Sequence, residues 1–441
     1  MTYNLIIIGG GASGLAAACA AAEIGARVLV LEKNHVPGRK ILSTGAGKCN
    51  FSNLEISPDF YHPHNPAFLN QTFKALPPAE IPAFFERLGL LWTRGETLSA
   101  SGGRGPIAPS TAENGRLFPR SMKAQDVAGV LVNRLAALGV NILTLTEATA
   151  VKKEKDDFLV ETRKVSPWEK NAPLSDKKVY RAARVIIAAG GATCPQIGGS
   201  LKGYALLESL GHSVSRLRPA LVPLKIKEKF VKNLDGVRLE ARLKLTDGKN
   251  NLGETAGELL FTGCGISGPA ALDLSRTALE ALDNAPVFAE ADFFREFTAQ
   301  KFKVLLFERA KSFSGRPFSH FACGLLNGKV LKAAAELAGI AWQGPLPGTE
   351  KIAKFGEILK AFRLEITGST GFEDAMVTAG GCALSEIDPS NFASKKVKGL
   401  YVTGELLDID GDCGGYNLHL AWTSGILAGR DAAEGKGDSG E

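Results

Sequence analysis

The stretch Ile6-Ile7-Ile8-Gly9-Gly10-Gly11-Ala12-Ser13-Gly14 decides the fold class of this chain. Its apolar residues end in glycines at the spacing Gly-x-Gly-x-x-Gly. An Ala-rich stretch of helical character follows at 15–24, and a second apolar run at 28–31 ends in Glu32. A strand, a glycine turn, a helix, a second strand and an acid in this order predict a βαβ unit that binds a dinucleotide.

Each part of this pattern has a physical role in dinucleotide binding. Gly9 permits the tight turn, Gly11 leaves room for a pyrophosphate at the backbone, and Gly14 lets the helix approach the strand. The helix N-terminus offers N–H groups and partial positive charge to phosphates. The Glu32 carboxylate can accept hydrogen bonds from ribose hydroxyls and repels a 2′-phosphate. The pattern therefore favours FAD or NAD over NADP; the competing interpretation is a glycine turn without a ligand.

Length and composition are those of an ordinary folded chain. It has 441 residues, a net charge of +6 and seven scattered cysteines without a C-x-x-C motif. This length allows two or three domains, and the cysteine pattern is typical of a reducing, cytoplasmic compartment. No apolar run approaches the length of about 18 residues that a membrane span needs. Because the basic residues alternate with acids, we expect a small-molecule substrate and no nucleic-acid partner.

The periodicities along the chain predict an α/β fold with a discontinuous first domain. Buried strands are expected at 140–145, 184–189 and 399–403, and a helix at 124–138. The segments 38–53 and 101–111 are predicted to be loops because they are rich in glycine and small polar residues. We expect a dinucleotide-binding domain from 1–190 and 370–441. A substrate-facing insertion between them should be β-rich over 191–268 and mainly helical over 269–369.

Two further glycine-rich stretches extend the cofactor pattern. The strand near 185 ends in Ala189 and Gly190, where the glycine avoids a Cβ that would clash with a cofactor. The strand at 399–403 is followed by Gly404, and the pair at 414–415 then begins a helix. Pointed at a flavin, the bare N–H groups of this helix start would favour negative charge at N1 and at the C2 carbonyl.

Together these stretches resemble the bacterial flavoproteins labelled aminoacetone oxidase family FAD-binding enzymes, some of which are assigned to bile-acid pathways. The resemblance spans nearly the whole chain. It is carried by the segments 9–14, 38–40, 44–50, 118–119, 190–203, 258–262, 265–269, 378–381 and 400–429. It implies FAD and a Rossmann-like FAD-binding domain of the discontinuous, glutathione-reductase-like kind. It also implies a redox activity, but it does not define the substrate.

The resemblance further implies cofactor contacts for individual residues. For the adenosine and pyrophosphate parts, these are Gly9, Gly11, Ala12, Ser13 and Gly14 at the pyrophosphate, Glu32 and Lys33 at the ribose, Arg39 and Lys40 at the phosphates or ribose, and Ala148 at the adenine. For the flavin part, these are Thr44, Gly45, Gly47 and Asn50 along one side, Gly404 and Glu405 at the ribityl chain, and Gly414, Gly415, Asn417 and Leu418 at the isoalloxazine.

Five positions depart from the pattern of the resembled family. Lys48 stands where relatives often have Arg, Gly263 where they often have His, Cys382 where Val is usual, Cys413 where Thr is usual, and His419 where Gln is usual. Polar changes of this kind near a flavin leave the substrate of the family open for this chain.

No residue is assigned as catalytic, and no metal site is predicted. Cys49 and Cys413 lack the spacing of a redox-active pair, and Tyr416 and His419 fit buried packing as well as they fit chemistry. The acids at 408–412 do not begin an EF-hand, because the twelfth position of such a loop holds His419 and not Glu.

The chain has no second Gly-x-Gly-x-x-Gly followed by a ribose acid, so NAD(P)H would act as a transient electron donor without a domain of its own. We predict an FAD-dependent oxidoreductase that acts on a small organic substrate by hydride transfer through flavin N5. Two alternatives remain open. One is an NAD(P)H-dependent reductase of an activated C=C bond, and the other is a flavin-dependent RNA-modifying or flavin-sensing protein. The oligomeric state is left open.

Overall fold

The computed structural model describes residues 2–63, 65–95, 115–166 and 177–434. The chain divides into two compact units, Met1–Arg218 with Val377–Glu441, and Pro219–Met376. The predicted loop at 101–111 lies outside the described residues. Among the helices that the structure describes, none has both the length and the apolar content needed to cross a bilayer.

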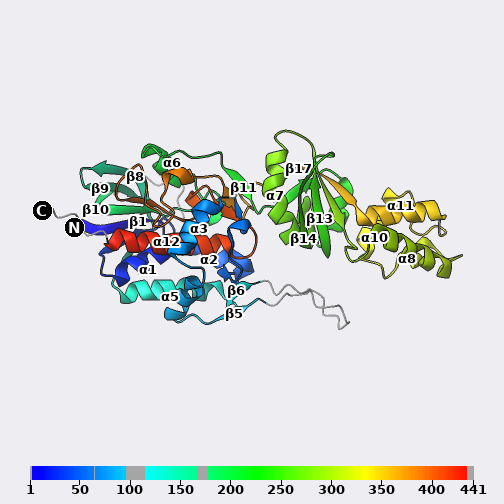
Figure 1. Cartoon of the computed structure of the whole chain (residues 1–441), viewed down its shortest axis with the longest axis horizontal. Helices are drawn as coiled ribbons and strands as arrows, with labels where there is room; N and C mark the ends of the chain where they lie inside the picture. Colours follow the sequence, from blue (N-terminus) through cyan, green and yellow to red (C-terminus); the bar gives the residue numbers. More distant parts are fainter. Residues whose placement is uncertain (1, 64, 96–114, 167–176, 435–441) are drawn as a thin grey trace. The chain divides into compact units, whose positions relative to one another are not determined.

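The first unit is built on a seven-stranded sheet in the order β7-β2-β1-β10-β9-β8, with β19 also paired to β10 (Figure 1). The strands are β1 (Thr2–Ile8), β2 (Val28–Leu31), β7 (Asn141–Leu143), β8 (Thr146–Glu154), β9 (Asp157–Lys164), β10 (Lys178–Ile187) and β19 (Leu400–Val402). β1, β2, β7, β10 and β19 run parallel, and β8 and β9 form an antiparallel hairpin. β2 is buried along its whole length, as is typical of a parallel strand covered on both faces.

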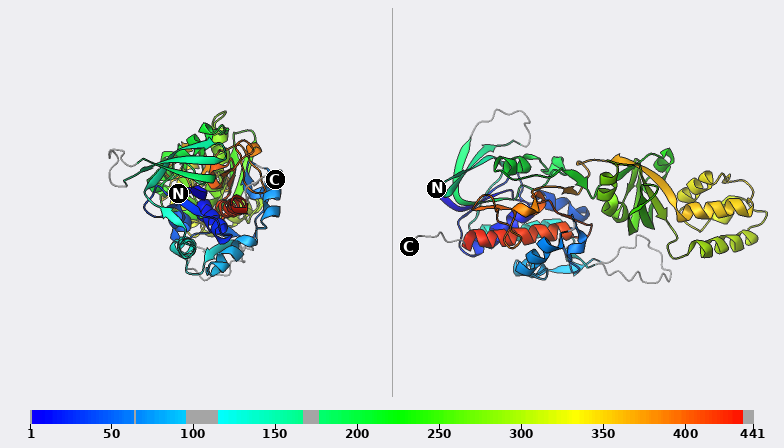
Figure 2. Two further views of the ribbon diagram at one scale, coloured as in Figure 1. Left: turned by 90° about the vertical axis from the view of Figure 1, so that its left-hand side faces the viewer. Right: turned by 45° about the horizontal axis from the view of Figure 1, so that its top comes forward.

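Two helices from opposite ends of the chain pack side by side on this sheet. α1 (Ala12–Glu23) follows the first glycine turn and α12 (Tyr416–Glu434) follows the last one (Figures 1 and 2). A Cβ at Gly425 or Gly429 would clash with the backbone oxygen of Ser13 or Ala17, so these glycines permit the close approach. Because position 425 lies beside 13 and 429 beside 17, the helices run in the same direction. α12 therefore begins roughly 12 Å before the level at which α1 starts, at 1.5 Å per residue.

The remaining elements of the first unit surround the two glycine turns. β3 (Ser52–Asn53), β6 (Arg116–Pro119) and β5 (Trp92–Arg94) form a small sheet, and β4 (Tyr61–His62) pairs with β20 (Asp410–Gly411). The other elements are α2 (Arg39–Ser43), α3 (Pro66–Ala75), α4 (Glu80–Arg87), α5 (Ala124–Ala137), α6 (Lys202–Ser209) and β18 (Val377–Ala379), with one-turn helices at Thr44–Gly47, Pro58–Phe60, Pro195–Ile197, Leu384–Glu386 and Gly404–Leu406.

The second unit contains a closed β-barrel in the order β12-β15-β14-β13-β16-β17. Its strands are β12 (Leu224–Ile226), β13 (Arg238–Thr246), β14 (Asn251–Thr262), β15 (Gly265–Ser267), β16 (Val287–Asp292) and β17 (Phe362–Ser369), and β11 (Arg218–Ala220) precedes them. In β16 buried and half-buried residues alternate, which is the pattern of a strand with one face in a core.

Helices complete the second unit. They are α7 (Pro269–Ala281), α8 (Ala299–Ser312), α9 (Phe318–Ala322), α10 (Gly328–Leu337) and α11 (Thr349–Lys360), with a 3₁₀ segment at Lys229–Leu234. Aromatic side chains such as Phe302, Phe318 and Phe355 join the helices to the barrel in one apolar core that includes Phe261 and Phe362. α8 to α11 lie in the chain between the barrel strands β16 and β17.

The structure confirms the α/β fold and the strands and helix predicted at 140–145, 184–189, 399–403 and 124–138. The loop predicted at 38–53 is wrong in part, because α2 and a one-turn helix occupy 39–47. The unit boundaries also differ from those expected. Residues 191–218 belong to the first unit, and β16 and β17, from the segment expected to be mainly helical, belong to the barrel. β16 was not predicted as a strand because Ala and Glu, which are typical of helices, make up half of its six residues.

Candidate functional site

The first glycine turn has the geometry of a phosphate-binding helix start. Gly9 has a φ of +110°, and its N–H donates to the Leu31 carbonyl at 2.8 Å. A Cβ at Gly14 would clash with the Gly9 carbonyl oxygen, whereas a Cβ at Gly11 would have no atom within 4 Å. α1 begins without a side-chain cap, so its first N–H groups face this open space. Ala12 and Ser13 form the first turn of the helix.

Glu32 is held against this turn at the end of β2. Its Oε2 accepts the Gly10 N–H at 2.7 Å, and its Oε1 accepts the N–H and the side-chain amide of Asn34 at 2.6 and 2.8 Å. The residue is only 6% exposed. Backbone and amide donors therefore fix the carboxylate next to the turn, where the sequence predicts a ribose. Arg39 lies nearby, with Nη1 3.4 Å from Asn34 Oδ1.

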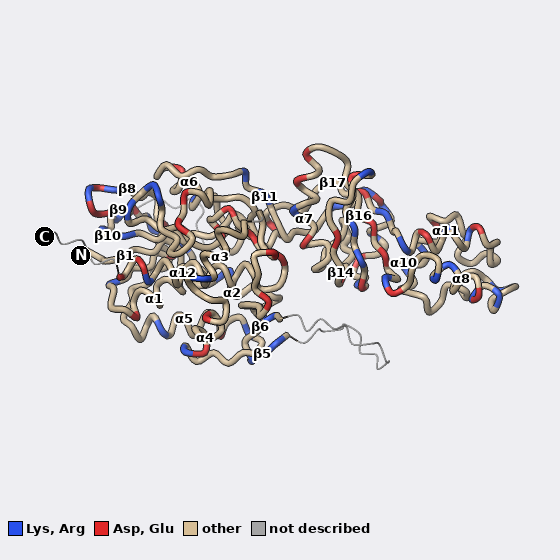
Figure 3. Tube along the Cα trace, in the orientation of Figure 1, with Lys and Arg blue, Asp and Glu red and all other residues tan. Residues whose placement is uncertain are grey.

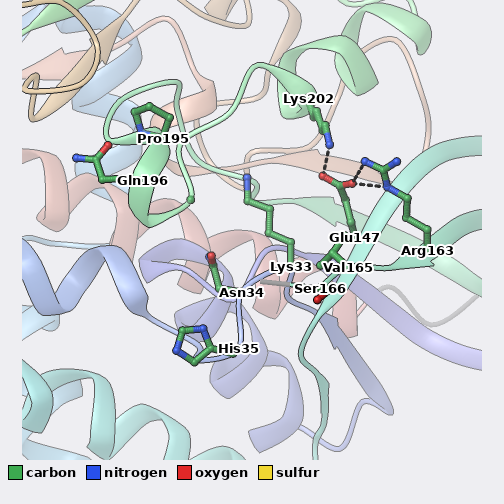
Figure 4. Close-up of a pocket in the computed structure, with 11 residues that line it drawn as sticks. Lys33, Asn34, His35, Glu147, Arg163, Val165, Ser166, Pro195, Gln196 and Lys202 are labelled. Carbon is green, nitrogen blue, oxygen red and sulfur yellow. Dashed lines mark hydrogen bonds and ion pairs between the residues drawn. The ribbon is translucent and has the colours of Figure 1, made fainter. Parts of the chain in front are cut away.

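A cavity of about 240 Å³ lies beyond Glu32 (Figure 4). Its lining residues are Lys33, Asn34, His35, Glu147, Arg163, Val165, Ser166, Pro195, Gln196, Gly198 and Lys202. Glu147 is nearly buried and accepts hydrogen bonds from Arg163 and Lys202, each at 2.6 Å. Burial acts to raise the pKa of Glu147, but the hydrogen bonds and charges of these two cations outweigh it and lower the pKa. Ala148, predicted to meet adenine, follows Glu147 and is buried.

Lys33 also lines this cavity, and burial lowers the pKa of its ammonium. Lys33, predicted at the ribose, thus lines the same cavity as Glu147, which precedes Ala148 in the chain. The sequence did not point to Glu147, Arg163 or Lys202, because they belong to β8, β9 and α6, which meet only in the folded unit.

A second polar network links four separate segments of the first unit. Lys40 Nζ lies 2.7 Å from Glu405 Oε2 and 2.6 Å from Thr193 Oγ1. Glu405 Oε1 accepts the N–H of Thr378 at 2.9 Å. Burial acts to raise the pKa of Glu405, but the Lys40 charge and its hydrogen bond hold that pKa below the ordinary value. A Cβ at Gly191 would clash with this carboxylate. Lys40 and Glu405, predicted at different parts of the cofactor, are therefore joined to each other.

The last glycine turn is held by side chains from β3 and β4. The Asn53 amide donates to the Gly414 carbonyl at 2.9 Å, and the Tyr61 hydroxyl donates to the Tyr416 carbonyl at 3.0 Å. Gly415 has a φ of +95°, and a Cβ there would lie 2.6 Å from the Ser52 carbonyl oxygen. Asn417 exchanges two hydrogen bonds with Gly411, at 2.8 and 2.6 Å. Leu418 lies in the first turn of α12. Gly404 lies beside Ser13 of the first turn.

The predicted flavin-side segment meets the last turn. Gly45 and Gly47 have φ values of +57° and +83°. The Thr44 hydroxyl donates to the Ile41 carbonyl at 2.7 Å. Asn50 Oδ1 is buried without a hydrogen-bond partner among the described residues, and it lies 2.9 Å from a Cβ built at Gly415. A buried acceptor without a partner is costly unless a ligand or water satisfies it.

These observations fit a bound dinucleotide. The open space at Gly11, the unpartnered Asn50 oxygen and the cradle at 414–415 lie in one unit. A Cβ built at Gly190 also has open space, with no atom within 4 Å, and Ala189 precedes it at the end of β10. The contacts that individual residues make with a cofactor stay predictions.

Two histidines beside the cradle were missed or left open by the sequence. His62 Nε2 lies 2.8 Å from Asp412 Oδ1, and both side chains are partly exposed. The pairing of β4 with β20 brings them together, although they are 350 residues apart in the chain. His419 is fully buried, with Nδ1 2.8 Å from Ser52 Oγ, and burial lowers its pKa to about 3. His419 is therefore neutral at ordinary pH.

The thiols do not form a redox pair. None of the seven cysteines forms a disulfide in the part of the chain that the structure describes. Burial raises the pKa of Cys49 to about 12, so this thiol is not an activated nucleophile. Gly263 lies in the second unit, in the turn between β14 and β15. Lys48 follows the one-turn helix of the flavin-side segment.

A family model described as "HI0933-like protein Rossmann domain" matches residues 3–431. The chain belongs to this HI0933-like family. It is 34% identical over 435 residues to a 3-dehydro-bile acid delta(4,6)-reductase of Clostridium scindens, which covers 97% of this chain and 98% of that protein. It is 26% identical over 439 residues to a ribosomal RNA dihydrouridine synthase of Escherichia coli, covering 98% and 99% of the two chains.

Among solved structures, the chain is similar to a 3-ketosteroid-delta4-(5alpha)-dehydrogenase from Rhodococcus jostii, with 15% identity, a TM-score of 0.48 and coverage of 98% of this chain and 97% of that one. A flavocytochrome c3 fumarate reductase matches with 15% identity and a TM-score of 0.47, covering 98% and 78%. The HI0933-like family is one of FAD-dependent oxidoreductases, and the resemblance stated from the sequence is confirmed. This chain is therefore an FAD-dependent oxidoreductase with a Rossmann-like FAD-binding domain.

Proposed function

We propose that this HI0933-like protein reduces a carbon–carbon double bond that is conjugated to a carbonyl group. The observation that carries the proposal is its 34% identity, over 97% of the chain, to an enzyme named for reducing such bonds in a 3-dehydro-bile acid. The more distant dihydrouridine synthases are named for a product in which the C5–C6 bond of uracil, conjugated to the C4 carbonyl, is saturated. The two kinds of relative differ in substrate and share this type of bond.

The residues of the last glycine turn support such chemistry. FAD, when bound, would supply hydride through N5. The positive end of the α12 helix dipole, at Tyr416, would favour negative charge on the flavin pyrimidine ring. Asn50 presents an unpartnered buried acceptor beside Gly415, which suits an N–H donor of that ring.

Reduction of a conjugated double bond also needs a proton at the carbon next to the carbonyl. We assign this role to His62. Its imidazole is partly exposed, and Asp412, two residues before Gly414, orients it through the 2.8 Å hydrogen bond. His419 does not suit the role, because it is fully buried and neutral.

The bond type can be tested in a half-reaction. FAD-loaded protein is reduced without oxygen by NADPH, NADH or dithionite and then mixed with a 4-en-3-one steroid. We expect the absorbance of oxidised flavin to return and the saturated ketone to form. If only oxygen restores the absorbance, or if an amine reduces the flavin and peroxide forms in air, the protein is an oxidase and the proposal is wrong.

The proton donor can be tested separately in the same assay. H62N should slow reoxidation by the enone about 100-fold and leave reduction of the flavin unchanged. The solvent-exposed His320 provides the control H320N, which should behave as wild type. A wild-type rate in H62N would remove His62 from the mechanism without affecting the proposed bond type.

A second candidate substrate is uracil within RNA, and the charge of the second unit favours it. The segment 297–361, which contains α8 to α11, carries ten Lys or Arg residues and four Asp or Glu residues, a net charge of +6 (Figure 3). The whole chain also carries +6, so the remaining residues are neutral in sum. The expectation of no nucleic-acid partner rested on local alternation of charges, which did not reveal this concentration. A cationic module of this kind is suited to a phosphate backbone.

This candidate predicts salt-dependent RNA binding. A K301E/K303E/K332E variant should weaken binding to a uridine-containing RNA hairpin and reduce the slope of log K against log[salt] by about three. Reoxidation by a free enone should be unchanged. If wild-type protein does not bind RNA at about 150 mM salt, the uracil candidate is wrong and the enone proposal stands.

A further inference from the structure

A buried cluster of potential metal ligands lies in the first unit, apart from the cofactor residues. It consists of His212, Cys382 and Glu386. One ligand atom of each residue lies within 4.8 Å of the others. His212 Nδ1 is 2.9 Å from Glu386 Oε2 and 3.6 Å from Cys382 Sγ. His212 is 4% exposed and Cys382 is fully buried.

The cluster joins two segments that are far apart in the chain. His212 follows α6, shortly before the chain leaves the first unit, and the other two residues follow β18, after the chain has returned. Val214 forms an isolated bridge with Cys382, and the Ser215 hydroxyl accepts the Gly381 N–H at 3.0 Å. The backbone thus already holds the outgoing and returning segments together, and it places the three side chains in fixed positions.

Two of the three distances between ligand atoms are close to those of a tetrahedral zinc site, and the third, from Cys382 Sγ to the Glu386 carboxylate, is within 4.8 Å. With bonds of about 2.0 Å to nitrogen or oxygen and about 2.3 Å to sulfur, the ligand atoms should lie about 3.6 Å apart for N and S and about 3.3 Å apart for N and O. The observed 3.6 Å between Nδ1 and Sγ matches, and the 2.9 Å between Nδ1 and Oε2 requires an opening of a few tenths of an ångström. The donor set of imidazole, thiolate and carboxylate suits Zn²⁺.

The surrounding residues orient these ligands as outer-shell partners do in metal sites. Ser394 Oγ lies 2.9 Å from His212 Nε2, so the imidazole can bind a metal through Nδ1 in the tautomer that carries its proton on Nε2. Lys396 pairs with Glu386 Oε1 at 2.6 Å, which leaves Oε2 directed at the cluster.

We propose that His212, Cys382 and Glu386 bind one Zn²⁺ ion, with solvent at the fourth position. Binding forms Zn–N, Zn–S and Zn–O bonds, breaks the S–H bond of the thiol and releases that one proton to solvent, while the neutral imidazole keeps its proton on Nε2. Burial raises the pKa of Cys382 to about 12, so the metal must displace that proton. Burial also acts to raise the pKa of Glu386, but its bonds with Lys396 and Ser213 hold that pKa at about 2, so its carboxylate is ready to bind. The ion would cross-link the segment of His212, which leads out of the first unit, to the segment of Cys382 and Glu386, which follows the return of the chain.

The test is zinc titration of the FAD-loaded protein after treatment with EDTA. We expect one Zn²⁺ per chain, and a rise in Tm of about 5 °C at a zinc concentration of 100 Kd. C382V, which keeps the size of the side chain, and E386Q, which keeps a hydrogen-bond acceptor for His212, should each weaken binding at least about 100-fold. Both should retain the flavin content of wild type.

The exposed Cys264 of the second unit provides the matched control. C264S should bind zinc as wild type does. If wild-type protein binds no zinc, the cluster is only a hydrogen-bond network and the proposal is wrong. The proposal is equally wrong if C382V binds zinc as tightly as wild type, because surface ligands would then hold the ion.

Discussion

The two glycine turns of the FAD-binding unit each precede a helix and differ in how they are held. The first turn, 9–14, is closed by its own neighbours: Gly9 bonds to the adjacent strand, and Gly14 packs on the Gly9 carbonyl. The last turn, 411–417, is held by Ser52, Asn53 and Tyr61, which lie more than 350 residues earlier in the chain. A local motif can therefore be recognised from spacing, whereas the last turn acquires its shape only in the folded unit.

The largest expected effect comes from breaking the first turn. G14A should cost more than about 3 kcal/mol of unfolding free energy, because the new Cβ meets a backbone oxygen that cannot move alone. G11A places its Cβ where no atom lies within 4 Å, so it should change stability by less than about 1 kcal/mol and still lose most FAD. Urea denaturation and flavin content measure the two effects. Equal loss of stability in both variants would show that the turn is not organised as described.

Adding a single methyl group to the last turn should destabilise the protein, because the turn packs against Ser52, a residue far away in the chain. G415A adds strain at a φ of +95° and places a Cβ 2.6 Å from the Ser52 carbonyl oxygen. We expect a loss of about 2–3 kcal/mol and a shift in the flavin reduction potential. The control G129A lies in α5 with open space around its Cβ, and it should be neutral or stabilising. If the flavin reduction potential of G415A equals that of wild type, the last turn does not act on the flavin and the prediction is wrong.

His419 offers a test that depends on pH. Its imidazole lies in the helix after the last turn and is hydrogen-bonded to Ser52 of β3, and it gains a proton near its ordinary pKa only after the chain unfolds. Its pKa falls from 6.5 to about 3 on burial, so below pH 6.5 the unfolded chain gains a proton that the folded chain does not. This contribution to stability is present above pH 6.5 and is lost as the pH falls toward 3. Between pH 7 and pH 5, wild type should lose on the order of 2 kcal/mol more than H419Q. Parallel pH–stability curves for the two proteins would contradict this.

The smallest effect is expected at the ion pair of Lys40 and Glu405, which lies outside both glycine turns. K40M leaves Glu405 without its cation, and because the pair is 31% and 19% exposed we expect a loss of only about 1 kcal/mol at pH 7. The depressed pKa of Glu405 contributes stability above its ordinary value of 4.5 and loses it as the pH falls further. The difference between wild type and K40M should therefore shrink at acid pH. The double variant K40M/E405Q should recover part of the loss, and no recovery would show that the charge pair is not responsible.

The sequence predicted more of the fold than of the site. Periodicity located the parallel strands and α5, because buried strands and amphipathic helices leave apolar patterns within a few residues. It did not locate the barrel boundary, because the Ala and Glu residues of β16 read as helical. The His62–Asp412 pair left no pattern at all, since its members meet only through the pairing of β4 with β20. The same is true of Lys40 with Glu405 and of the cluster around Cys382.

The sequence by itself determined that this chain contains a Rossmann-like βαβ unit whose second strand ends in an acid, Glu32, because turn, helix and strand are local and contiguous. The resemblance added FAD and the family. Only the tertiary structure decided which charges pair, which histidine is neutral and how the helices that follow the two glycine turns, α1 and α12, are aligned. Those outcomes depend on contacts between residues hundreds of positions apart, and on burial, which no local pattern encodes.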